Sequence, residues 1–160
     1  MRAIGIRVKP SEVLYTVLEK KDSDEKYIFK INTLNLPQCY NNDFPRQLSF
    51  IRTTFHSIIC EYNIKYAGIR THEGNTRTFS IPRINIEGVI QELFSDSTII
   101  HYFAGTLNSI ASRLGKNVSD IKECRNGETN LFGISNWNNM TKEKRESYLA
   151  ALASIPRGDL

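Results

Sequence analysis

Residues 2–9 read RAIGIRVK, the pattern of a β-strand buried on at least one face. Ile4, Ile6 and Val8 occupy every second position, which is the period at which side chains of a strand point to the same face. Gly5 lies on the opposite face and has no side chain, so another element can pack closely there. This stretch therefore predicts a strand with tightly packed neighbours.

Two more strands are predicted directly after it. Residues 12–19, EVLYTVLE, are rich in β-branched and aromatic side chains, and residues 26–32, KYIFKIN, alternate polar with large apolar residues. Pro10-Ser11 and the polar segment 21–24 provide the turns between them. We expect three consecutive antiparallel strands.

The rest of the chain alternates helix and strand patterns. Apolar residues spaced by three and four predict helices, and short apolar runs predict strands. The predicted elements are a helix over 46–62, a strand over 64–70, a loop over 71–82, a helix over 86–94, a strand over 97–103, a helix over 107–114 and a helix over 141–155. Because a helix joins the third strand to the fourth, we expect a crossover and a parallel neighbour.

Size and composition favour one domain over residues 1–160, with a polar insertion at about 116–140 in which Trp137 is the expected anchor. With 21 basic and 17 acidic residues, the net charge of +4 gives a mild bias toward anionic partners, although many proteins with this balance bind no nucleic acid. The 3 cysteines are widely spaced, which argues against a disulfide framework or a zinc site. No apolar run approaches the roughly 18 residues of a membrane span. We expect a soluble, cytoplasmic protein.

This order of elements resembles the ribonuclease H-like superfamily, which implies an α/β fold with a mixed five-stranded sheet and helices on both faces. In that fold the first strand lies between the second and the fourth. Within the superfamily the chain resembles the Holliday-junction-resolvase branch, whose first strand carries Gly-Ile-Asp and whose fourth ends in Ile-Glu. The matching positions here are Gly5-Ile6-Arg7 and Ile69-Arg70. The resemblance implies that Arg7 and Arg70 stand where that branch has metal ligands.

The chain is also similar to an uncharacterised bacterial family of unknown function related to that branch. Its members have a first strand of the type Gly-Val-x-Leu-Lys-Gly, a fourth strand ending in Ile-Arg, a basic glycine-rich loop and a helix opening with a Glu-Ala-x-Ile-Gln-like pattern. The counterparts here are Gly5 to Lys9, Ile69-Arg70, the loop with Arg77 and Arg83, and Glu87 to Gln91. Thr71, Glu73 and a shortage of glycines depart from the family's loop. That family has no assigned activity.

A metal-dependent nuclease needs several carboxylates around two Mg²⁺ ions about 4 Å apart. Arginines at positions 7 and 70 would repel such ions. The remaining acids for an atypical site are Glu87, Glu143 and Glu146, the last two spaced to share one helical face as in resolvases with two acids on the final helix. The alternative is that residues 142–146, KEKRE, form a solvated, charge-alternating first turn.

The basic residues near the two strand ends suit an anion instead. A guanidinium offers a rigid fork of donors to phosphate and keeps its charge at any relevant pH. The candidate nucleic-acid-binding residues are Arg7, Lys9, Arg70, His72, Arg77 and Arg83, with Tyr66, Phe79 and Tyr102 as stacking faces. The alternative is that Arg7 pairs with Glu12 or Glu87, Arg70 pairs with Glu73, and the aromatic residues belong to the core. His56 and His101 are expected to be structural.

Three functional hypotheses follow. The first is a catalytically degenerate ribonuclease H-like domain that binds DNA or RNA and uses no metal or other cofactor. The second is a structural or interaction subunit that joins a protein partner or forms a homodimer. The third is a nuclease that uses Mg²⁺ with Glu87, Glu143 and Glu146.

Overall fold

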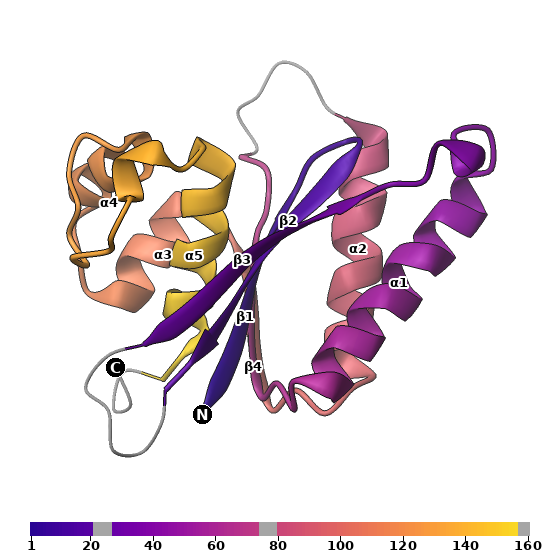
Figure 1. The fold of residues 1–160 in the computed structure, drawn as a ribbon, viewed down its shortest axis with the longest axis horizontal. Helices are drawn as coiled ribbons and strands as arrows, with labels where there is room; N and C mark the ends of the chain where they lie inside the picture. Colours follow the sequence, from indigo (N-terminus) through magenta and orange to yellow (C-terminus); the bar gives the residue numbers. More distant parts are fainter. Residues whose placement is uncertain (21–26, 74–79, 157–160) are drawn as a thin grey trace.

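The computed structural model describes residues 1–20, 27–73 and 80–156. Its strands form one five-stranded sheet in the order β3-β2-β1-β4-β5, with β1 in the middle as expected (Figure 1). The elements are β1 (Arg2–Val8), β2 (Glu12–Glu19), β3 (Ile28–Asn35), η1 (Gln38–Tyr40), α1 (Phe44–Glu61), β4 (Tyr66–Arg70), α2 (Ile81–Ser95), β5 (His101–Gly105), α3 (Leu107–Leu114), α4 (Val118–Asn126), η2 (Trp137–Asn139) and α5 (Lys142–Ser154).

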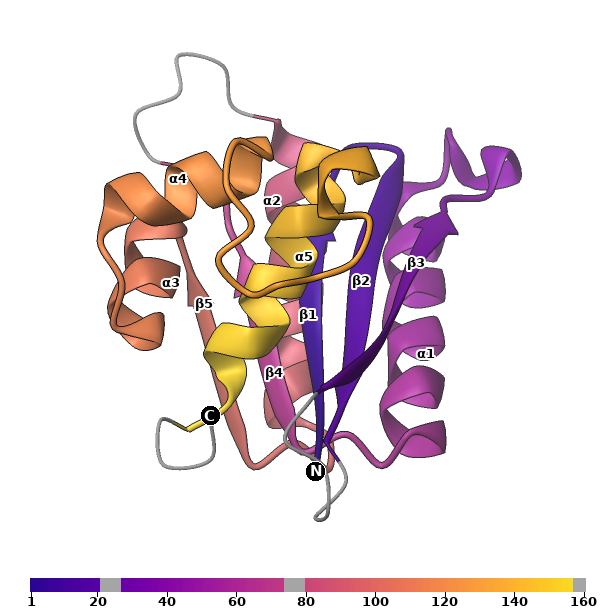
Figure 2. The same cartoon turned by 60° about the vertical axis from the view of Figure 1, so that its left-hand side comes forward.

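The sheet is mixed, and helices cover both of its faces. β1 and β2 are antiparallel, as are β2 and β3, whereas β4 runs parallel to both β1 and β5. α1 and α2 lie on one face, and α5 lies along the other with α3 and α4 packed beside it (Figures 1 and 2). This arrangement confirms the predicted fold class and strand order.

The alternation in β1 divides the core into two layers. Ile4, Ile6 and Val8 are buried against α1 and α2, whereas Ala3 belongs to the cluster under α5. Odd-numbered side chains of β1 therefore face α5. The side chain of Arg7 is among them.

Two glycines bring α5 close to the sheet. Gly5 on β1 and Gly68 on β4 are direct register partners. A Cβ atom at Gly5 would overlap the backbone of Ser147 and Ala151, and one at Gly68 would overlap that of Ala150. Because neither position has a side chain, α5 lies directly on these strands. Its first turn is thereby placed over the carboxyl ends of β1 and β4.

Several boundaries differ from the predicted ones. β3 and β5 begin two and four residues later than expected, and α2 begins at Ile81, five residues early. The early start of α2 has a local cause: the Ser80 hydroxyl accepts a hydrogen bond from the backbone N–H of Arg83, and Pro82 occupies the first turn. The predicted loop over 71–82 is therefore shorter, and its residues 74–79 lie outside the described part of the chain.

The polar segment 116–140 contains a helix that the sequence analysis missed. In α4, Ile121 and Cys124 are buried, and the helix ends at Gly127, whose φ of 86° is left-handed. Trp137 is buried as expected, and its indole N–H donates a hydrogen bond to the Cys124 carbonyl at 2.8 Å. The segment is therefore anchored to the core through α4.

The structure shows the exposure of the three cysteines and the lengths of the described helices. Cys39 and Cys60 are exposed, Cys124 is buried, and none of the three forms a disulfide. In the described ranges, no helix is long and apolar enough to span a bilayer.

Candidate functional site

Arg7 and Arg70 lie side by side at the carboxyl ends of two parallel strands. They are register partners on β1 and β4, and both side chains are on the face covered by α5. Arg7 Nη1 donates a hydrogen bond to the Arg70 carbonyl at 3.5 Å. The structure confirms that these two arginines adjoin.

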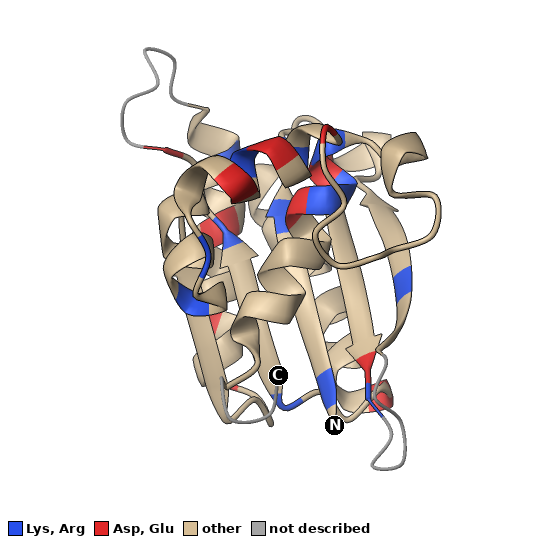
Figure 3. Ribbon diagram, turned by 90° about the vertical axis from the view of Figure 1, so that its left-hand side faces the viewer, with Lys and Arg blue, Asp and Glu red and all other residues tan. Residues whose placement is uncertain are grey.

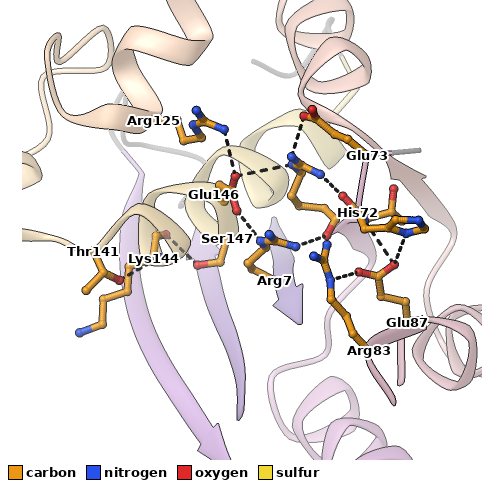
Figure 4. Close-up of polar contacts among 12 residues, drawn as sticks. Arg7, His72, Glu73, Arg83, Glu87, Arg125, Thr141, Lys144, Glu146 and Ser147 are labelled. Atoms are coloured by element: carbon orange, nitrogen blue, oxygen red, sulfur yellow. Dashed lines mark hydrogen bonds and ion pairs between the residues drawn. The ribbon is translucent and has the colours of Figure 1, made fainter. Parts of the chain in front are cut away.

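Glu146 is the carboxylate around which the arginines gather. Arg7 Nε contacts its Oε2 atom, while Arg70 Nε and Arg125 Nη1 each lie 3.7 Å from its Oε1 atom. Only 3% of the Glu146 side chain is exposed. The interpretation of KEKRE as a solvated turn is therefore wrong for Glu146, because the close packing of α5 turns this residue toward the sheet (Figure 4).

A second set of ion pairs lies on the α2 side of the site. Arg70 Nη2 donates to Glu73 Oε1 at 2.8 Å, and Arg83 Nε donates to Glu87 Oε1 at 2.8 Å. The other oxygen of Glu87 accepts the backbone N–H of His72 at 3.4 Å and lies 3.8 Å from that residue's Nδ1. The expected pair between Arg70 and Glu73 is confirmed.

The expected partners of Arg7 were wrong. Its carboxylate partner is Glu146 on α5, whereas Glu87 pairs with Arg83. Glu12 pairs with Lys9, whose Nζ lies 2.5 Å from Glu12 Oε1. Lys9 is not among the residues that line the pocket at this site.

The side chains surround a pocket of about 200 Å³ at the carboxyl ends of β1 and β4. Five basic and three acidic side chains line it, together with His72. The basic residues are Arg7, Arg70, Arg83, Arg125 and Lys142, and the acidic residues are Glu73, Glu143 and Glu146. Figure 3 shows basic and acidic segments intermixed around the first turn of α5. The lining has a net positive charge.

Burial and mutual repulsion act on these arginines. Burial lowers the pKa of the Arg70 guanidinium, and although the Glu146 carboxylate opposes this shift, Arg7 and Arg83 reinforce it. Burial also lowers the pKa of Arg83, again reinforced by Arg7. Carboxylates therefore offset the repulsion only in part, and a bound anion would offset it further.

Three guanidinium nitrogens at the site have no hydrogen-bond partner within the described residues. They are Arg7 Nε, Arg70 Nε and Arg83 Nη2, all buried from solvent. The first two approach Glu146 as ion pairs without the geometry of a hydrogen bond. Buried donors without partners are rare, and a ligand with acceptor oxygens is one way to satisfy them.

Tyr66 and Tyr102, two of the three predicted stacking residues, lie away from the pocket. Tyr66 lies at the opposite end of β4 from Arg70 and stacks on His101, with ring centroids 6.0 Å apart. Tyr102 is exposed beside Phe94. Neither tyrosine lines the pocket.

Two predicted residues lie outside the described ranges, and the remaining histidines are exposed. Arg77 and Phe79 belong to the segment 74–79. His56 is exposed on α1 beside Cys60, and His101 is exposed on β5. Their exposure does not test the expected structural role of these histidines, which stays a prediction.

The candidate nuclease acids are only partly brought together. Glu143 and Glu146 line the pocket, but Glu87 is bonded to Arg83 and does not line it. Across residues 1–20, 27–73 and 80–156, no cluster of three or more His, Cys, Asp or Glu side chains is placed to hold a metal ion. Of these three acids, Glu87 and Glu146 pair with arginines.

Arg125 and Lys142 were missed in the sequence. Arg125 comes from α4, whose signals were present: Asn117 at the N-cap, apolar residues at intervals of three, and Gly127 after the last turn. Lys142 was assigned to a solvated turn. The polar composition of the segment 116–140 obscured α4 and with it Arg125.

Solved structures share this architecture. RuvC from Thermus thermophilus superposes with a TM-score of 0.69 at 8% sequence identity, covering 96% of this chain and 92% of that chain. The T. thermophilus RuvC in complex with Holliday junction substrate gives 0.66 at 10% identity over the same shares. The Fowlpox virus resolvase, in a complex with substrate Holliday junction DNA, gives 0.52 at 11%, covering 96% of this chain and 95% of that chain.

The chain has a ribonuclease H-like fold of the resolvase type. No protein-family model and no curated protein matches it. The similarity to an uncharacterised bacterial family therefore rests on the short motifs alone. At such low identity the solved structures establish the fold, and the function must be argued from the site.

Proposed function

We propose that this chain is a catalytically degenerate ribonuclease H-like domain that binds nucleic acid through its arginine-lined pocket. The observation that carries the proposal is the register pairing of Arg7 with Arg70, which puts two guanidinium groups at adjoining strand ends. Five basic side chains line the pocket against three carboxylates. Guanidinium donors in this number suit phosphate oxygens.

The fold supports the choice of nucleic acid as the anion. Two of the similar structures are complexes with Holliday junctions, a branched DNA. In this chain Arg7 and Arg70 lie at the carboxyl ends of β1 and β4, and Glu146 lies near the N-terminal end of α5, so these charged groups share one end of the sheet. A phosphate backbone could dock there without divalent ions.

The internal ion pairs favour a second function. Glu146, Glu73 and Glu87 each contact an arginine of the site, and such pairing is what a structural or interaction subunit would also show. This alternative predicts no binding of nucleic acid. The third hypothesis, a Mg²⁺-dependent nuclease, lacks a described cluster of ligands and is the least supported.

The test is binding of labelled single-stranded DNA, RNA and a four-way DNA junction, measured by fluorescence anisotropy in EDTA between about 50 and 200 mM salt. The wild-type chain is compared with Arg125→Gln, which alters a half-buried pocket residue, and with Arg46→Gln. Arg46 is a matched control because its side chain is 76% exposed and pairs with Asp43 at the start of α1.

We expect salt-dependent binding that weakens in Arg125→Gln, with a salt slope about one unit shallower, because one phosphate contact is lost. Arg46→Gln should bind like the wild type. Absence of binding to every probe at about 50 mM salt would remove the proposal and leave the interaction subunit. Equal affinity in both variants would place the contact elsewhere on the molecule.

A further inference from the structure

We propose that the pocket takes the terminal phosphate of a nucleic-acid strand, in preference to a phosphate within the strand. This inference rests on the proposed function and specifies which phosphate the site recognises. The size of the pocket, the depth and positive charge of its arginines, and a buried Arg83 donor point to this ligand.

The size of the pocket limits what can enter. Its volume of about 200 Å³ is below the roughly 300 to 1,000 Å³ of pockets that hold whole small-molecule ligands. A space of this size suits a single phosphate group better than an enclosed nucleotide. An internal phosphate carries a sugar on each side, so both neighbours would have to follow it inward.

The arginine donors lie deep, and this favours a chain end. Only 4% of the Arg70 side chain and 13% of the Arg7 side chain are exposed. The Nε atoms of both residues face Glu146, so a ligand atom must enter the pocket to reach their outer guanidinium nitrogens. A terminal phosphate is attached on one side only, so it can enter while the rest of the strand stays outside.

The charge and acceptors of a terminal phosphate also match the site. A phosphomonoester carries a charge of about −1.5 to −2 near neutral pH and presents three acceptor oxygens, as in a phosphorylated side chain. An internal phosphodiester carries one charge and two such oxygens. Arg83 Nη2 is a buried donor without a hydrogen-bond partner among the described residues, whereas Arg7 Nε and Arg70 Nε already face Glu146.

Glu87 does not reverse the charge balance. It bonds to Arg83 outside the lining, and counting it leaves five basic groups against four carboxylates. Glu146 already lies between Arg7 and Arg70, so a phosphate would share their outer donors and leave this carboxylate in place. The pocket can thus hold an anion without exposing Glu146.

The experiment compares four probes of one base sequence: a strand with a 5′-phosphate, one with a 3′-phosphate, one with hydroxyls at both ends, and a covalently closed circle. Affinities for wild-type protein are measured in EDTA at one fixed salt concentration. We expect one of the two phosphorylated strands to bind about tenfold tighter than the hydroxyl strand and the circle, and the preferred end identifies the polarity.

Two variants locate the effect. In Arg83→Gln and in Arg125→Gln the preference for the phosphorylated strand should fall toward onefold, whereas Arg46→Gln should keep it. Because both pocket variants alter partly exposed residues, at least one should remain folded, as checked by circular dichroism. A preference that survives in a folded pocket variant would overturn the inference.

The outcomes separate this inference from the proposed function. If all four probes bind wild-type protein with equal affinity, the site binds nucleic acid but does not select an end, and only the inference fails. If none of the four binds, the proposed function fails as well.

Discussion

At the scale of single residues, one carboxylate compensates for three arginines. Glu146 is almost fully buried and contacts Arg7, Arg70 and Arg125. Its negative charge therefore offsets the positive charge of three arginines in the pocket. A buried charge that loses its partner is costly, because neither water nor another ion replaces it. The negative charge of Glu146 therefore limits how strongly the arginines attract an anion.

Replacing Glu146 with Gln should destabilise the protein by about 3 kcal/mol at low salt, because three guanidinium groups lose their shared carboxylate. Added phosphate should recover part of this stability, since an anion that binds only the folded state stabilises it. Urea unfolding with and without phosphate measures both effects. Glu92→Gln is the control, because Glu92 pairs with Arg52 on the exposed surface. Equal losses in the two variants would contradict the role of Glu146.

The arginines also explain why the site should not bind divalent cations. In Arg7→Asp/Arg70→Glu, two new carboxylates would join Glu143 and Glu146, giving the oxygen ligands that divalent ions prefer. We expect Mn²⁺ to raise the melting temperature of this variant and to leave that of the wild type unchanged. Stabilisation of the wild-type protein by Mn²⁺ through this site would show that the arginines do not exclude metals.

At the scale of elements, the site depends on how closely α5 lies on the sheet. Gly5 and Gly68 remove the side chains that would otherwise hold the helix away. Thr16 on β2 adds a buried hydrogen bond, 2.7 Å long, between its hydroxyl and that of Ser147. These contacts fix the first turn of α5 and with it the position of Glu146.

Substitution of Gly5 by Ala should therefore cost about 3 kcal/mol or more, because its Cβ would overlap the backbone of Ser147 and Ala151. Gly88→Ala is the matched control: Gly88 lies within α2, and its new methyl group would meet no atom within 4 Å. That substitution should stabilise the protein by about 0.5 to 1 kcal/mol. Chemical denaturation measures both. A mild effect at Gly5 would mean that α5 can shift outward.

Tyr148, in the middle of α5, should make the free energy of unfolding depend on pH in the alkaline range. Burial raises the pKa of Tyr148 above its ordinary value of 10.0, so the folded state keeps the phenol protonated. This contribution is fully present below pH 10 and is lost as pH rises, because only the unfolded chain ionises there. The expected slope is up to about 1.4 kcal/mol per pH unit. In Tyr148→Phe, urea titrations at pH 9 to 11 should show a smaller change of the unfolding free energy with pH. An unchanged slope would mean that other groups cause the pH dependence.

At the scale of the whole molecule, much of the fold was predictable from sequence. Local periodicity predicted the strands and helices, and the helix between β3 and β4 predicted a parallel neighbour, because crossover connections restrict the topology. The order that places β1 between β2 and β4, and Arg7 beside Arg70, came from the resemblance to the ribonuclease H-like superfamily.

The partners of the arginines were not predictable in the same way. Whether Glu146 faces solvent or the sheet depends on glycines in two strands far from it in sequence, and no local pattern carries that information. Arg125 was missed because polar residues concealed the short helix α4. The network of charges is a tertiary property, set once distant elements pack.

Arg7 and Arg70 together are expected to meet a phosphate and not a metal ion. The most direct measurement is the NMR signal of their Nε–Hε groups, assigned by Arg→Lys variants, during titration with a short single-stranded oligonucleotide in EDTA. We predict that both signals shift when the oligonucleotide is added. In a separate sample without EDTA or oligonucleotide, Mn²⁺ should leave both signals unbroadened. Unshifted arginine signals in the presence of bound oligonucleotide, or strong broadening by Mn²⁺, would contradict the account.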